Sequence, residues 1–139
     1  MLLQILDRKE KLKFLDLALH MIAIDGPISD AEKKLLELLI NELGEEITAE
    51  YHFELSSDLE ATLNFLGEKE QHVRNLIYLN LAVLILLEEF YNTKEHFFLE
   101  EIRIKLKVDE KAKTKLMRLV YEQKDLNDKI KKAIYELSK

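Results

Sequence analysis

Two acidic residues, Asp25 and Glu32, stand on either side of a short turn and are the first candidates for chemistry in this sequence. Because the turn joins two predicted helices, both carboxylates would face a common point at the end of a helical hairpin. A shift of the chain against itself by 63 positions aligns Asp25 with Glu88 and Glu32 with Glu95. If the two halves pack about a pseudo-twofold axis, the four carboxylates form an oxygen-rich site of the kind that binds Ca²⁺ or Mg²⁺.

The same acidic residues also have a purely structural explanation. Ser29 followed by Glu32 predicts a capping box, in which each side chain accepts a hydrogen bond from the backbone amide of the other residue. Asn92 followed by Glu95 resembles a second box, and Asp25 is of a residue type common in turns. The sequence has no EF-hand loop, whose alternating acids and closing glutamate would be a stronger signal for calcium. Cation binding and helix formation are therefore both open interpretations of these residues.

Signals for enzymatic chemistry are missing from the sequence. Without cysteine, the chain has no thiol nucleophile, no disulfide and no Cys-ligated zinc site. Its three glycines are scattered, so they form no phosphate-binding loop, and its few serines stand in capping contexts rather than in a nucleophile elbow. We therefore predict a non-enzymatic protein. A small hydrolase with paired carboxylates is a remote alternative, because it requires convergent acids with separated pKa values in a cleft.

The elements that must position these residues are helices. An almost uninterrupted apolar stretch runs from Leu76 to Leu87, and only Asn80 within it is strongly polar. A helix that is apolar nearly all round is a buried one, and a bilayer-spanning helix needs about 20 apolar residues. The stretch therefore predicts the central helix of a bundle, without membrane insertion. One proline and three glycines in 139 residues favour long helices joined by short polar turns.

We predict a single all-α domain over residues 1–139, a compact bundle of about seven helices. The shift by 63 also aligns apolar residues, which predicts two pseudo-repeated helical hairpins, roughly 12–44 and 75–107, around the buried central helix. The apolar spacing places helices at 9–24, 30–43, 46–55, 58–67, 68–90 and 92–106, then one that begins near Asp109, and a last one with Leu126, Ile130, Ala133, Ile134 and Leu137 on one face.

Charge limits the choice of partners. The formal net charge is −6, which argues against general nucleic-acid binding, because nucleic-acid-binding proteins present basic surfaces. Residues 42–70 contain nine acids and one lysine, whereas residues 103–139 contain twelve basic residues and six acids. Two solvated faces, or a contact between an acidic and a basic flank, would each produce this pattern. Since the N-terminal stretch lacks a basic region and a long apolar run, we expect a cytoplasmic protein.

The segment from Ala23 to Glu32 resembles the motif of the TerB-like family, all-helical domains named for tellurite resistance. The shared pattern is a small or apolar residue, Asp-Gly, a spacer residue, Ile or Val, and a glutamate four residues later. The family typically repeats a related pattern in its second half. At the corresponding place this chain has Glu-Glu-Phe-Tyr at 88–91, without Asp-Gly.

The resemblance implies a stress-associated or scaffold module in which clustered carboxylates hold a divalent cation. Asp25 and Glu32 match the family motif by position, whereas Glu88 and Glu95 match only through the internal repeat. We therefore expect a non-enzymatic helical module that acts through protein partners or self-association. The alternative is a purely structural or homodimerising helical domain without an ion site.

Overall fold

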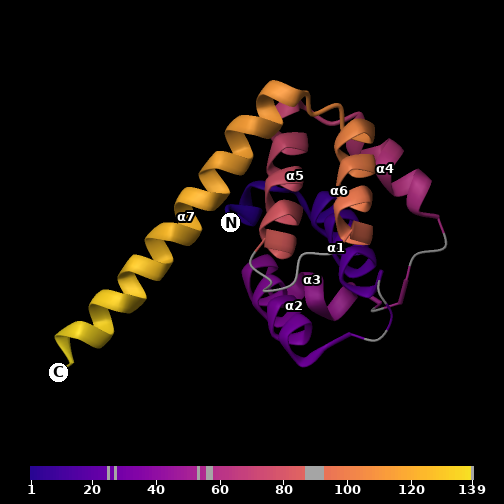
Figure 1. The fold of residues 1–139 in the computed structure, drawn as a ribbon. Helices are drawn as coiled ribbons and strands as arrows, with labels where there is room; N and C mark the ends of the chain where they lie inside the picture. The colour runs from indigo at the N-terminus through magenta and orange to yellow at the C-terminus, as the bar shows by residue number, and fades with distance from the viewer. Residues whose placement is uncertain (25, 27, 53, 56–57, 87–92, 139) are drawn as a thin grey trace.

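A computed structural model describes residues 1–24, 26, 28–52, 54–55, 58–86 and 93–138, and every regular element among them is helical. The all-α class is therefore confirmed (Figure 1). Within these residues, no helix is both long enough and apolar enough to cross a membrane. In chain order the elements are the 3-10 turn η1 (Leu3–Ile5) and the helices α1 (Arg8–Ala23), α2 (Asp30–Leu43), α3 (Glu45–Glu50), α4 (Leu59–Gly67), α5 (Gln71–Leu86), α6 (Thr93–Lys105) and α7 (Glu110–Leu137).

Local sequence signals explain where helices begin. At the start of α2, the Ser29 hydroxyl accepts a hydrogen bond from the Glu32 amide, and the Glu32 carboxylate accepts one from the Ser29 amide, both at 3.2 Å. The predicted capping box is thus confirmed. The same reciprocal pair joins Asp7 and Glu10 at the start of α1, where no box was predicted. The predicted cap at Asn92 lies outside the described residues.

Helix α1 packs against α2, α3, α4, α5 and α6, and α5 packs against α1, α6 and α7, so the central place of α5 stays a prediction (Figure 1). Ten of the sixteen residues of α5 are buried, so neighbours cover more than one side of it, as its apolar sequence requires. The largest fully buried side chains come from several helices and include Tyr78, Phe14, Ile77 and Ile102. Residues far apart in sequence, such as Phe14 and Ile102, therefore belong to one core.

One pair of helix starts has the spacing of 63 residues. Helix α1 begins at residue 8 and α5 at residue 71. The connections within the two predicted hairpins include positions 25, 27 and 87–92, which are outside the described residues. The pseudo-repeat as a pair of equivalent hairpins therefore stays a prediction.

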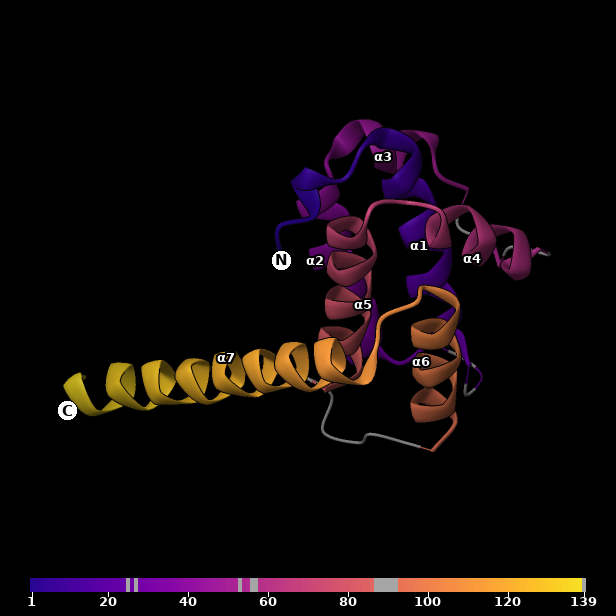
Figure 2. The same ribbon diagram turned by 90° about the horizontal axis from the view of Figure 1, so that it is seen from above.

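Several predicted helices have different bounds in the structure. The helix expected over 68–90 is α5, described from Gln71 to Leu86, and the one expected over 46–55 is only Glu45–Glu50. The prediction of two helices after Asp109 was wrong, because residues 110–137 form one continuous helix. Neither glycine nor proline occurs in that stretch, so nothing in the sequence ends the helix midway. Figure 2 shows α7 projecting from the packed helices, so its far half lies outside the compact bundle.

The end of α4 lies very close to the end of α6. A Cβ atom added to Gly67 would be 2.9 Å from the carbonyl oxygen of Lys105. Gly67 was predicted to close its helix, and α4 does end there. Its backbone does not have the positive φ found at Gly26 and Gly44. The close approach of two helices, rather than a left-handed turn, therefore explains the glycine.

Candidate protein-interaction surface

Of the four carboxylates predicted to hold a cation, the structure describes two. Glu32 is partly exposed, and one of its two carboxylate oxygens accepts the capping hydrogen bond from Ser29. Glu95 is buried in the first turn of α6. Asp25 and Glu88 lie outside the described residues, so the four-residue site stays a prediction. In the part of the chain that the structure covers, no group of three or more His, Asp or Glu side chains is arranged to hold a metal ion.

The polar residue inside the apolar stretch, Asn80, has a structural role. Its side chain is 2% exposed, and its amide nitrogen donates to the carbonyl oxygens of Leu76 and Met1, both at 2.9 Å. The Met1 amino group in turn donates to the Asn80 side-chain oxygen and forms an ion pair with Glu42 at 3.0 Å. Asn80 therefore joins the first residues of the chain to α5 and satisfies its own polar atoms inside the core.

A residue with a left-handed backbone conformation forms the connection from α6 to α7. Lys107 has a φ of 58°, and its amide donates to the Ile104 carbonyl at 3.1 Å. The next amide, that of Val108, donates to the Arg103 carbonyl at 3.1 Å. These two bonds form a Schellman motif, in which glycine usually occupies the position that Lys107 has here. The motif turns the chain sharply between α6 and α7.

A charged cluster fixes the direction in which α7 leaves α6. The Arg103 guanidinium donates to the Glu100 carboxylate, to the Val108 carbonyl at 2.8 Å and to the Glu110 carboxylate at 3.0 Å, and Lys113 also contacts Glu100. Burial acts to raise the pKa of Glu100, but the hydrogen bonds from Lys113 and Arg103 outweigh it and hold that pKa below its usual value. Glu100 is thus the anionic centre of the junction.

Among the described residues, the buried and partly buried positions of α7 all lie in its first part. Asp109 caps the helix by accepting from the Ala112 amide at 2.8 Å, and Leu116 and Met117 pack partly buried against the core. Val120 is the one fully buried residue of α7. From residue 121 to residue 138, every residue is exposed. We call residues 121–137 the distal arm; Figures 1 and 2 show it extending away from the other helices.

One face of the distal arm carries large apolar side chains in water. The leucine and isoleucine side chains on this face are between 48% and 86% exposed. From Leu126 they recur every three or four positions, and Leu119 stands seven positions before Leu126, so they lie along one line of the helix that begins at Leu119. We call this line the apolar stripe; it consists of Leu119, Leu126, Ile130, Ala133 and Leu137, with Ile134 beside it.

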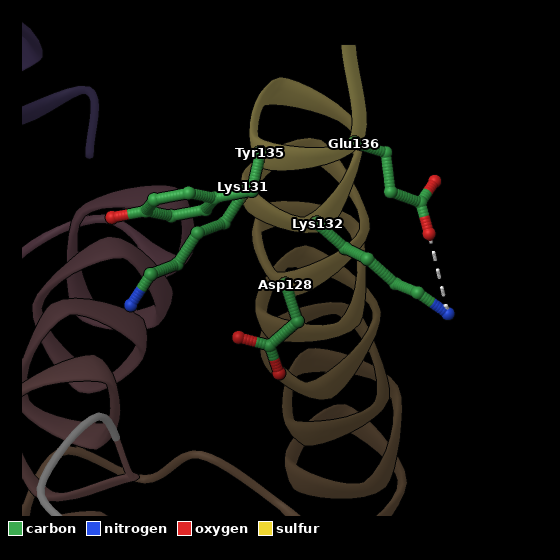
Figure 3. Close-up of a pocket in the computed structure, with 5 residues that line it drawn as sticks. All are labelled: Asp128, Lys131, Lys132, Tyr135 and Glu136. Carbon is green, nitrogen blue, oxygen red and sulfur yellow. Dashed lines mark ion pairs between the residues drawn. The ribbon is translucent and has the colours of Figure 1, made fainter. Parts of the chain in front are cut away.

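The opposite face of the distal arm is polar. Figure 3 shows a shallow hollow formed by Asp128, Lys131, Lys132, Tyr135 and Glu136, with an ion pair between Lys132 and Glu136. All five residues belong to one helix, so the hollow does not bring different elements together as a binding site would. A second hollow forms where α7 leaves α5 and is lined by Val83, Val120, Gln123 and Asn127, among others. It adjoins the beginning of the apolar stripe.

The sequence contained a signal for this surface. The stripe residues from Leu126 to Leu137 were predicted to lie on one helix face, but apolar spacing does not say whether a face is covered by the same chain or by another. Length does. A helix of 28 residues is about 42 Å long, whereas a small domain is only about 30 Å across. Had residues 110–137 been predicted as one helix, its far end would have been expected to project.

Comparison of the chain with models of protein families, with curated proteins and with solved structures found no match. The TerB-like resemblance therefore rests only on the residues from Ala23 to Glu32 and on the internal repeat.

Proposed function

We propose that this protein is a non-enzymatic helical scaffold module that acts through protein contacts made by the distal arm of α7. The observation that supports this proposal is the apolar stripe. Single exposed apolar residues are common on protein surfaces, but a continuous line of them usually marks a place of interaction. An amphipathic helix of this kind typically packs its apolar face against a partner helix or in a groove.

The packed helices and the arm have separate roles in this proposal. Helices α1 to α6 and the first turns of α7 form the core, and the capped, charged junction at Glu100 and Lys107 holds α7 in a fixed direction. The stress association that the TerB-like resemblance implies is part of the same proposal. The divalent cation at Asp25, Glu32, Glu88 and Glu95 is a separate part, tested by calorimetric titration with Ca²⁺ and Mg²⁺ beside Asp25→Ala. Saturable binding that the variant loses supports the cation site.

Capture of interacting proteins from the native cell extract tests the role of the arm. The full chain is used as bait beside two variants, Ile130→Asp on the apolar stripe and Tyr135→Asp on the polar face. Both residues are exposed, so neither change disturbs the core. We expect Ile130→Asp to lose the proteins that the unchanged chain retains and Tyr135→Asp to retain them. Equal retention by all three proteins would refute a function carried by the stripe.

A further inference from the structure

The apolar stripe follows the spacing of a coiled coil. Adding Gln123 to it gives Leu119, Gln123, Leu126, Ile130, Ala133 and Leu137, separated alternately by four and three residues. The same alternation extends back to Leu116 and Ala112, which lie partly buried in the first turns of α7. An alternation of four and three is the heptad pattern in which positions a and d form the seam between two helices. Seven of the eight seam positions are apolar.

Charges of alternating sign run beside this seam. The residues immediately before each a position, the g positions of the heptads, are Lys115, Glu122, Lys129 and Glu136. All four are exposed. The other flank is different, because its e positions include Val120, which packs against the core, and the uncharged Asn127 and Ile134. The charged flank is therefore open along the whole of α7, while the protein itself covers part of the other.

We propose that a second copy of this chain covers the stripe and forms an antiparallel two-helix coiled coil about a twofold axis near residues 124 and 125. This inference rests on the proposed function and names the partner. A twofold dimer uses the same surface on both subunits, so the stripe must be complementary to itself. Residues 121–138 contain four lysines and four acids, so two arms approach without net repulsion.

The register follows from the seam. When a positions face d positions of an antiparallel neighbour, Ile130 lies against Leu119 of the partner subunit and Leu126 against the partner's Gln123. In this register the charged flanks also face each other. Glu122 then meets Lys129 of the partner subunit, and Lys115 meets the partner's Glu136. Each of these two contacts occurs twice by symmetry, so all eight flanking charges are paired with an opposite sign.

A parallel dimer would not use these charges. In parallel coiled coils, g residues meet e residues of the other helix, so Glu122 would face the partner's Asn127 and Lys129 would face the partner's Ile134. The parallel arrangement would also place both packed cores at the same end of the helix pair, on flanks that each core already covers in part. The antiparallel arrangement places them at opposite ends.

Sedimentation equilibrium of the purified full chain tests for the dimer. We expect a monomer–dimer equilibrium that Ile130→Asp shifts by about 100-fold or more toward monomer, because it places a charge in the seam, and that Tyr135→Asp leaves unchanged. Unchanged circular dichroism verifies that each variant is folded. Glu122→Lys should weaken the dimer roughly tenfold, because two attractive contacts become repulsive, and adding Lys129→Glu should restore it.

The distance between spin labels tests the orientation. The chain has no cysteine, so Ser138→Cys gives one labelled position at the exposed end of each arm. In the antiparallel register the two labels are separated by about 40 Å along the helices, whereas a parallel pair would hold them about 10 Å apart. A distance near the larger value supports the proposal.

Other outcomes overturn it in distinguishable ways. A chain that stays monomeric at high micromolar concentration, a short label distance, or a Glu122→Lys change that Lys129→Glu does not repair would each refute the antiparallel dimer. If such a chain still captures cellular proteins through Ile130, the dimer is refuted but the proposed function stands. If capture is independent of Ile130, the proposed function itself is refuted.

Discussion

Gly67→Ala separates two explanations for the glycine at the end of α4. If Gly67 were only a poor helix former, alanine would raise the free energy of unfolding by about 0.5–1 kcal/mol. The structure predicts the opposite, because the new Cβ would be 2.9 Å from the Lys105 carbonyl oxygen, where 3.4 Å or more is ordinary contact. A backbone carbonyl cannot rotate aside as a side chain can, so α4 and α6 must separate by a few tenths of an ångström.

The expected size of the effect follows from these opposing terms. Overpacking of this kind costs about 1–3 kcal/mol and outweighs the gain in helix propensity, so we expect Gly67→Ala to lower the free energy of unfolding by about 1 kcal/mol. For a chain of this size, that is a decrease in Tm of about 4 °C.

Urea and thermal unfolding followed by circular dichroism measure this difference. Asn64→Ala is the matched control, because Asn64 is exposed in the same helix and its replacement reports helix propensity alone. We expect the control to gain about 0.5 kcal/mol. If Gly67→Ala is as stable as Asn64→Ala, or more stable than the unchanged protein, the two helices do not meet as closely at this point as the structure indicates.

Three further predictions concern stability. Lys107→Gly should raise the free energy of unfolding by about 1 kcal/mol in urea titrations, because glycine adopts the positive φ without strain; a loss would contradict the Schellman assignment. Glu100→Gln should lower it by about 1–2 kcal/mol at neutral pH, since two cations lose their anion. Because the folded pKa of Glu100 is lowered from 4.5, this difference should shrink as pH falls below that value, and a pH-independent difference would refute the assignment. Burial and the hydrogen bond to Asp16 raise the pKa of Tyr51 above its usual 10.0. Tyr51→Phe should therefore remove one phenol that titrates above that value in absorbance at 295 nm, and should cost about 1 kcal/mol of stability that disappears as pH rises beyond it.

Local signals in the sequence predicted the helices well. The box at Ser29 and Glu32 requires only two residues three positions apart, so the start of α2 was predicted at the residue where it begins. The continuous apolar run from Leu76 is also a local signal, and it predicted the position of α5. The end of α3 was less predictable, because its six helical residues have little apolar spacing and depend on packing against α1 and α2.

Features that depend on contacts distant in sequence could not be predicted. The close approach of Gly67 to Lys105 joins residues 38 positions apart, and no local pattern reveals it. The burial of Glu95 is of the same kind, since an acidic residue in the first turn of a helix is usually solvated. The exposure of the distal arm was not predicted for a different reason: the spacing of Leu126, Ile130 and Ile134 is the same whether the helix packs on its own core or not.

The exposure of every residue of the distal arm has a consequence for how its helix is maintained. Most helices in proteins are held by packing, and isolated ones shorter than about 12–15 residues are marginal in water. Here Asp109 and the packed turns around Val120 supply the nucleus, and the arm only elongates it. Its backbone hydrogen bonds therefore open more readily with distance from Val120, and amide exchange should slow steadily from Leu137 back toward Val120. Any molecule that binds the stripe must bind the formed helix, so occupancy of the stripe and completeness of the helix rise together.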